Sequence, residues 1–151
     1  MFPELALIQQ GVHRANAGWR DDFSIGISAA INMIDAFQAN LSVILNIGSD
    51  LSFVAPNHSL YPTDMVKPLS YSVIKFGIIG LTKYCAVTFP HIRVNCLCPG
   101  SIDQGQKVPA NPMGRLARLD ELKGAVAFML SDASSYMTGA VVVVDGGRSC
   151  L

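Results

Sequence analysis

The apolar residues of this chain are arranged in two ways, and each arrangement predicts a different kind of element. Between positions 24 and 40 they recur every three or four residues, as they do on one face of a helix. The members of this face are Ile27, Ile31, Ile34 and Phe37. A second helix is predicted from about Tyr71 to Thr88, where Pro90 stops it, and a third over 120–130, whose first turn is acidic.

Short apolar runs rich in β-branched residues separate these helices and predict buried strands. The runs cover 41–48, 91–98 and 140–145, with a weaker candidate, LALI, at 5–8. The segments 49–70 and 101–113 carry several prolines and are predicted to be loops. Strands that alternate with helices favour parallel crossover connections, so we expect an α/β fold in which helices cover both faces of a parallel sheet.

Composition indicates which partners and which cellular compartment to expect, but it says little about the reaction. The 151 residues are sufficient for a single domain, 1–151, in which half of the residues are hydrophobic. The formal net charge is zero, so the chain lacks the excess of positive charge that favours binding to nucleic acid or to an anionic membrane surface. No apolar run approaches the roughly 20 residues of a membrane span, and the N-terminal segment lacks the features of a signal peptide. We therefore expect a cytoplasmic protein without nucleic acid or membrane partners.

The four cysteines show no pattern of metal ligation or of paired redox thiols. Cys85, Cys96, Cys98 and Cys150 include no C-x-x-C pair and no partnering cluster of histidines. Cys96 and Cys98 are two positions apart in a predicted strand, so both should point to the same face. We expect reduced core thiols and no metal site.

Candidate chemistry centres on the sequence YSVIK, in which Tyr71 and Lys75 are one helical turn apart and therefore share a face. The sequence around this pair supports a catalytic role. The strand at 41–48 leads into Ser49, and ligands of open α/β sheets bind at the carboxyl ends of strands. A free tyrosine has a pKa of about 10, and a neighbouring ammonium favours the phenolate and brings the phenol into range for acid–base catalysis. The alternative is a pair of polar residues on a packed helix.

A set of short motifs occurs in a fixed order along most of the chain. They are Asn-Ala-Gly at Asn16–Gly18, the strand ending at Ser49, Tyr71 with Lys75, the strand ending at Pro99-Gly100, and a last strand followed by Asp-Gly-Gly at 145–147. In residue type and order they resemble the short-chain dehydrogenase/reductase family, from about Asn16 to Arg148. Segments such as NIGSDLS, VKPLSYSVIK and PGSIDQGQ further resemble members associated with flagellin modification and nonulosonic acid biosynthesis.

This resemblance implies a partial Rossmann-like, doubly wound parallel sheet, and hydride exchange between NAD or NADP and an alcohol or carbonyl carbon of a sugar or sugar nucleotide. Tyr71 would be the acid–base group, Lys75 would hold the nicotinamide ribose, and Ser49 would donate a hydrogen bond to the substrate oxygen. The residues that would contact or support the cofactor are Asn16, Gly18, Tyr71, Lys75, Pro99, Gly100 and Ile102. The family's usual interval from the tyrosine falls at His58, but Ser49 caps the strand and is the preferred candidate.

The chain also departs from the family's pattern. No stretch supplies the family's glycine-rich turn, Thr-Gly-x-x-x-Gly-x-Gly, whose backbone N–H groups cradle the cofactor pyrophosphate. We therefore expect the N-terminal βαβ half of the sheet to be missing, and the choice between NAD and NADP stays open. Gly26 stands at the position of the family's catalytic asparagine, and the segment from Pro99 to Pro112 is short for a substrate-covering helix.

Three interpretations remain open at this point. The chain is an NAD(P)-dependent oxidoreductase that is impaired in isolation, a non-catalytic remnant that associates with itself, or an incomplete copy of an ordinary enzyme. In the family's strand order, the candidate strand at 5–8 would pair with a strand of the missing half, and without that partner it would leave unpaired backbone groups and an uncovered apolar face. We therefore expect a homo-oligomer.

Overall fold

A parallel sheet forms the centre of the structure, a computed structural model that describes residues 18–61, 67–105 and 111–151. Its three strands within these ranges are β1 (Val43–Ile47), β2 (Arg93–Pro99) and β3 (Val141–Val144), in the order β1-β2-β3. Both pairings are parallel, so the carboxyl ends of all three strands meet at one edge of the sheet. This is the edge at which the sequence predicts the site.

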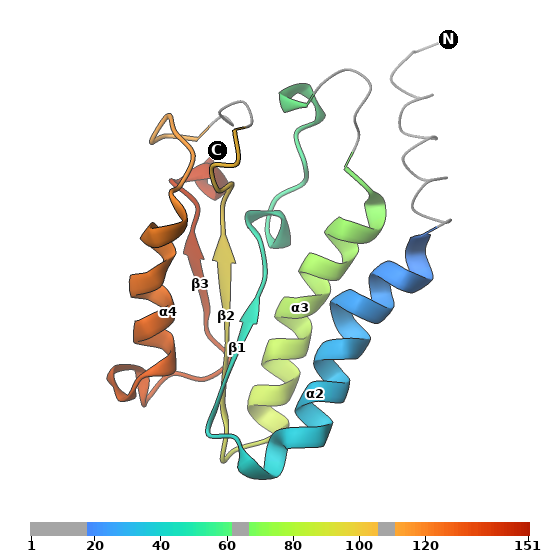
Figure 1. Cartoon of the computed structure of the whole chain (residues 1–151), viewed down its shortest axis with the longest axis vertical. Helices are drawn as coiled ribbons and strands as arrows, with labels where there is room; N and C mark the ends of the chain where they lie inside the picture. Colours follow the sequence, from blue (N-terminus) through green and yellow to red (C-terminus); the bar gives the residue numbers. More distant parts are fainter. Residues whose placement is uncertain (1–17, 62–66, 106–110) are drawn as a thin grey trace.

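Helices cover both faces of the sheet, as predicted (Figure 1). The helices α2 (Ala29–Phe37) and α3 (Leu69–Thr88) lie on one side, and α4 (Lys123–Leu130) lies on the other. A hydrophobic core lies between the helices α2 and α3 and the sheet. Its buried members are Ile27, Ile74, Ile78, Cys96 and Cys98 in one cluster, and Ile34, Cys85, Ile92 and Val94 in a second.

The local patterns predicted the strands and two of the three helices well. The runs at 41–48, 91–98 and 140–145 coincide with β1, β2 and β3, and the helix expected from Tyr71 to Thr88 is α3. The helix expected over 120–130 divides into a 3-10 turn, Leu119–Leu122, and α4. The weaker strand candidate, LALI at 5–8, lies outside the described residues.

The helix predicted over 24–40 starts earlier and is less regular than expected. Residues 18–23 are already helical, Ser24–Ser28 form a π turn, and α2 follows directly. Gly26 lies in this turn against α3, where an added Cβ would be 2.5 Å from Cγ2 of Ile74. A side chain at position 26 would therefore displace Ile74. The family resemblance leads us to expect asparagine at this position, and close packing of the two helices explains why it is glycine.

The cysteines are core residues with one exception. Cys85, Cys96 and Cys98 are buried free thiols, whereas the free thiol of Cys150 is exposed in the last turn, Arg148–Cys150. The prediction of core thiols is therefore wrong for Cys150. The sulfur atoms of Cys96 and Cys98 are 3.7 Å apart, which confirms that the two side chains share one face of β2. In the described ranges, no group of three histidine, cysteine or acidic residues is placed to hold a metal ion.

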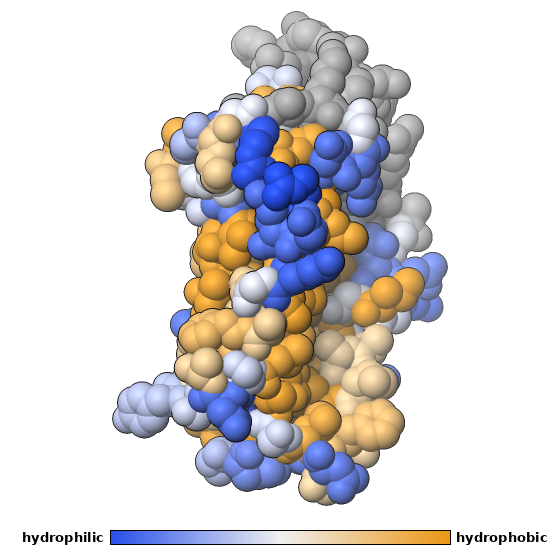
Figure 2. Space-filling model, turned by 60° about the vertical axis from the view of Figure 1, so that its left-hand side comes forward, coloured by the Kyte–Doolittle hydropathy of each residue, from blue (hydrophilic) through white to orange (hydrophobic). Residues whose placement is uncertain are grey.

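Large apolar side chains remain at the surface on the α4 side. Figure 2, which views the molecule from this side, shows apolar surface along much of its length. Phe128 and Leu130 are each 45% exposed, and Ile47, at the end of the edge strand β1, is 50% exposed. The α4 layer therefore covers this face only in part. None of the helices in the described part of the chain combines the length and hydropathy needed to cross a bilayer.

Candidate functional site

Tyr71 and Lys75 lie on one face of α3, close to the carboxyl end of β1. The Lys75 ammonium nitrogen is 5.7 Å from the centre of the Tyr71 ring and donates a hydrogen bond of 3.1 Å to the carbonyl oxygen of Ile47. Both side chains are half-buried. Burial lowers the pKa of Lys75 from its ordinary value, while the neighbouring thiols of Cys96 and Cys98 act in the opposite direction. The structure thus places the two residues together as their spacing predicts.

Ser49 follows β1 and caps the next turn. Its backbone is extended, its hydroxyl oxygen accepts a hydrogen bond of 3.1 Å from the Leu51 N–H, and its own N–H donates to the Ser52 hydroxyl. The Ser49 hydroxyl in turn donates to a carboxylate oxygen of Asp50 over 2.9 Å. Among the described residues, no hydrogen bond joins Ser49 to Tyr71. Ser49 is therefore at the strand end, as predicted, and is held by its own turn.

A buried ion pair next to Ser49 was not predicted from the sequence. The Nε atom of Arg148 lies 2.9 Å from Oδ2 of Asp50, and the two side chains are only 10% and 8% exposed. Arg148 reaches this position because the chain reverses at Gly146 and Gly147, whose φ angles of 68° and 86° suit glycine. The only sequence signal was an acidic residue directly after the candidate serine.

Asp145 fixes the turn that aims Arg148 at Asp50. Its carboxylate oxygens accept hydrogen bonds from the N–H groups of Gly147, at 2.8 Å, and Ser149, at 2.7 Å. Partial burial acts to raise the pKa of Asp145, but the hydrogen bonds from Ser149 and Gly147 outweigh it and lower that pKa. The Asp-Gly-Gly motif thus forms a turn in which the Asp145 carboxylate binds backbone N–H groups. This turn brings the C-terminal segment to the end of β1.

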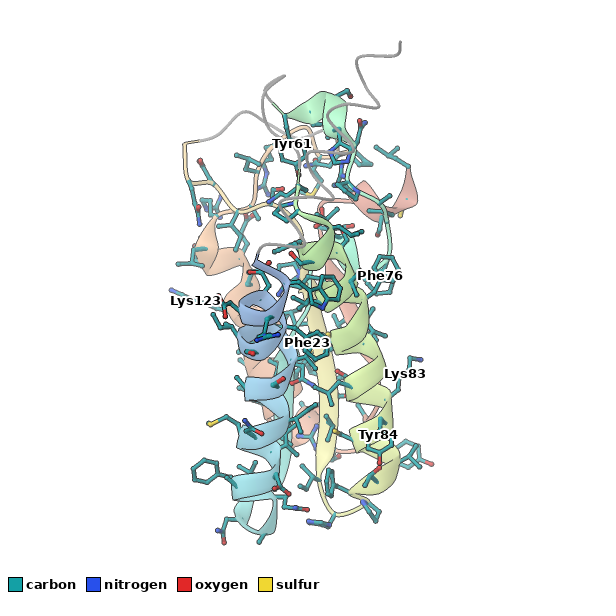
Figure 3. All side chains as sticks on the ribbon, turned by 90° about the vertical axis from the view of Figure 1, so that its right-hand side faces the viewer. Phe23, Tyr61, Phe76, Lys83, Tyr84 and Lys123 are labelled. Carbon is teal, nitrogen blue, oxygen red and sulfur yellow. The ribbon has the colours of Figure 1, made fainter. Side chains whose placement is uncertain are left out.

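A second phenol and a second ammonium accompany Tyr71. The Lys67 ammonium nitrogen is 5.0 Å from the centre of the Tyr71 ring and 5.6 Å from that of Tyr61. Tyr61 lies at the end of the molecule where α3 begins (Figure 3). Burial raises the pKa of Tyr61, Arg148 lowers it, and Asp50 and Tyr71 add to the increase. Both residues belong to a segment that was predicted only to be a loop.

The residues expected to contact the cofactor are only partly placed. Pro99 ends β2, and Gly100 continues the pairing through its N–H, which donates to the Val144 carbonyl over 2.9 Å. Ile102 follows, half-buried, in a bridge with Ala117. All three thus lie at or just beyond the carboxyl end of β2, and their contact with a nicotinamide stays a prediction.

Two further candidates belong to the Asn-Ala-Gly motif. Gly18 is the first described residue and is helical in the structure. Asn16 lies outside the described residues. Their roles beside the cofactor stay predictions.

Comparisons with known proteins identify the family of this chain. A family model described as enoyl-(acyl carrier protein) reductase matches residues 6–149. Cis-4-hydroxycyclohexanecarboxylate dehydrogenase of Sinomonas cyclohexanicum is 36% identical over 126 residues, which cover 75% of this chain and 47% of the relative. The 2-keto-3-deoxy-L-fuconate dehydrogenase of Xanthomonas campestris pv. campestris is 33% identical in an alignment that covers 87% of this chain and 49% of the relative.

The fold is also similar to that of a solved structure. The crystal structure of a 3-oxoacyl-(acyl-carrier protein) reductase with bound NAD from Brucella melitensis matches with a TM-score of 0.78 and 27% identity, over 89% of this chain and 53% of that one. The chain spans about half the length of the curated relatives it matches. With a family match over nearly the whole sequence, a parallel sheet between helical layers, and tyrosine and lysine on one helix face, the chain belongs to the short-chain dehydrogenase/reductase family.

Proposed function

We propose that this chain is an NAD(P)-dependent oxidoreductase in which Tyr71 exchanges a proton with the hydroxyl or carbonyl oxygen of a small substrate. The observation that carries the proposal is the position of the Lys75 ammonium, 5.7 Å from the Tyr71 ring at the carboxyl end of β1. Tyr71 would accept the proton of a substrate alcohol, with the Lys75 ammonium beside it as the balancing positive charge. In the reverse direction the same phenol returns the proton to the substrate oxygen.

The residues present fit one end of a nicotinamide cofactor. A lysine ammonium has three N–H groups, and Ile47 accepts a hydrogen bond from one of them, so others can donate to ribose hydroxyls. When bound, the nicotinamide supplies or receives the hydride. The sequence contains no glycine-rich turn of the kind that binds a pyrophosphate, so the fit extends to the nicotinamide riboside end only. We therefore propose weak cofactor binding and slow turnover by these residues alone, with either NAD or NADP.

We further propose a sugar, sugar acid or sugar nucleotide as the substrate. The sequence segments that resemble nonulosonic acid enzymes support this class, and one relative acts on 2-keto-3-deoxy-L-fuconate. The test is a turnover assay in which the purified chain is offered NAD or NADP with a panel of polyols and sugar acids, and nicotinamide reduction is followed by absorbance. Turnover restricted to simple secondary alcohols would contradict the sugar class. A complete lack of turnover, with nucleotide bound, would favour a non-catalytic binding module.

The outer side of α3 supports a homo-oligomer. Phe76 and Tyr84 project outward from this helix (Figure 3), and they are 49% and 69% exposed. Val87, one turn further along, is 84% exposed, and no atom lies within 4 Å of a Cβ added to Gly80. An apolar stripe with a glycine at its centre lets a second copy approach closely. We propose that two chains pack through this stripe.

Size-exclusion chromatography with light scattering tests this association. We expect the chain to elute larger than a monomer, and the Phe76→Asp/Val87→Asp variant to elute as a monomer, because two charges would be buried in the interface. The matched control is Leu119→Asp, at a position that is 70% exposed and away from α3. A stable monomer of the unmodified chain would contradict the proposal.

A further inference from the structure

Lys67 places a second ammonium group beside the ring of Tyr71. Its nitrogen is 5.0 Å from the centre of this ring, closer than the 5.7 Å of the Lys75 nitrogen, and it is 5.6 Å from the centre of the Tyr61 ring. A cation within about 6 Å of an aromatic face is attracted to the ring. The two phenol rings therefore hold the Lys67 ammonium next to the proposed acid–base group.

The Lys67 ammonium has no anionic partner within the described ranges. The ion pairs found there all belong to Arg115, Arg118 and Arg148, and Lys67 itself is half-buried, so its ammonium is not sealed from solvent. A lysine ammonium has three N–H groups and accepts nothing. Lys67 is therefore a donor of positive charge that the proposed mechanism leaves without a role.

Two carboxylates from the same end of the molecule already have other partners. Asp50 is paired with Arg148 at 2.9 Å. Asp22 accepts a hydrogen bond from the hydroxyl of Ser70, in the first turn of α3. Neither carboxylate neutralises the ammonium groups beside the acid–base tyrosine, so this part of the site suits a negatively charged ligand.

We propose that Lys67 is a specificity-determining residue that binds the carboxylate of the substrate beside Tyr71, so that the chain acts on sugar acids in preference to neutral sugars. This inference rests on the proposed oxidoreductase function and names the substrate class of the same site. Lys75 keeps its role toward the nicotinamide ribose, and Tyr71 keeps the proton transfer.

A carboxylate fits this ammonium better than a phosphate does. Lys67 supplies one positive charge and a carboxylate carries one negative charge, whereas a phosphate ester carries about 1.5 to 2 negative charges near neutral pH. Arg148 is already paired with Asp50, and Lys75 is assigned to the cofactor, so neither supplies the second charge. The structure therefore favours a sugar acid over a sugar phosphate.

The test is a binding titration of the folded chain, carbon-13 labelled in its tyrosine rings, followed by nuclear magnetic resonance with NADH present. The probes are gluconate, mannonate and galactonate, each compared with the alditol of the same configuration, and glucitol 6-phosphate. We expect at least one acid to shift the Tyr71 ring signal and to bind about tenfold more tightly than its alditol, the value of one hydrogen bond to a charged group.

Variants of Lys67 decide whether this preference comes from its charge. Lys67→Met should lower the ratio of acid to alditol affinity to about one, whereas Lys67→Arg should keep it, since arginine retains the charge. The matched control is Lys83→Met, on the outer side of α3, which should also keep it. Equal affinity for acid and alditol in every pair, a preference that survives in Lys67→Met, or tighter binding of glucitol 6-phosphate than of every acid would overturn the proposal.

Turnover separates this inference from the proposed function. With the acid that binds best, Lys67→Met should raise KM about tenfold and change kcat far less, because Tyr71 and Lys75 remain. An equal fall of kcat with acid and alditol would mean that Lys67 acts through Tyr71, and would contradict a role in binding the substrate. If neither acid nor alditol is oxidised, the oxidoreductase proposal fails, and the dependence of acid binding on Lys67 still decides the inference.

Discussion

Tyr71→Phe is expected to abolish whatever turnover the chain supports and to leave its fold unchanged. The substitution removes the only group proposed to move a proton, and general acid–base catalysis is typically worth about 10²–10⁴-fold in rate. The ring remains, so the nearby ammonium groups of Lys67 and Lys75 keep an aromatic face to contact. The measurement is kcat with the best substrate, together with a thermal unfolding curve.

The matched control is Tyr84→Phe, on the outer side of the same helix. Tyr84 is 69% exposed and far from the carboxyl end of β1, so loss of its hydroxyl should leave the rate as it is. Retained activity in Tyr71→Phe would remove this residue from the acid–base role. Equal losses in both variants would point to damage to α3 and would contradict the assignment as well.

The second large effect is expected at Gly100, where the structure leaves no room for a side chain. An added Cβ would lie 2.7 Å from the Cα atom of Asp145 and 3.1 Å from its carbonyl carbon. These are backbone atoms in the turn that aims Arg148, so they cannot move aside as a flexible side chain would. We expect Gly100→Ala to lower the free energy of unfolding by about 1–3 kcal/mol, the usual cost of overpacking.

Urea unfolding measures this difference, with Gly124→Ala as the control. Gly124 lies within α4, and no atom lies within 4 Å of an added Cβ, so alanine there should raise the free energy of unfolding by roughly 0.5–1 kcal/mol. If Gly100→Ala unfolds at the same urea concentration as the unmodified chain, the close approach of Gly100 to the Asp145 backbone would be contradicted. The turn at Asp145 would then not depend on a glycine at position 100.

The elements that could be predicted from sequence are those specified by local patterns. Short apolar runs rich in β-branched residues identified β1, β2 and β3, and Pro90 marked the end of α3. Helical geometry alone put Tyr71 and Lys75 on one face. The early start of the first helix was missed, because residues 18–23 carry no clear apolar period. Cys150 was grouped with the core cysteines on composition, although its position near the C-terminus leaves it exposed.

The parts of the site that escaped prediction depend on contacts between distant segments. Arg148 meets Asp50 only because the turn at Gly146 and Gly147 brings the C-terminal segment back over the end of β1. Lys67 reaches Tyr61 and Tyr71 through the path of a loop that has no periodic pattern. In the same way, the closeness of Gly26 to Ile74 becomes apparent only when two helices are packed together.

A titration of the purified, folded chain with NADH and NADPH tests the central claim most directly, with nucleotide fluorescence and the melting temperature as readouts. The account predicts binding of at least one nucleotide and a raised melting temperature, since a ligand that binds only the folded state stabilises it. Lys75→Met should lose both signals, and Lys83→Met, on the outer side of α3 (Figure 3), should keep them. A folded chain that binds neither nucleotide at millimolar concentration would contradict the account and leave Tyr71 and Lys75 as a pair without a cofactor.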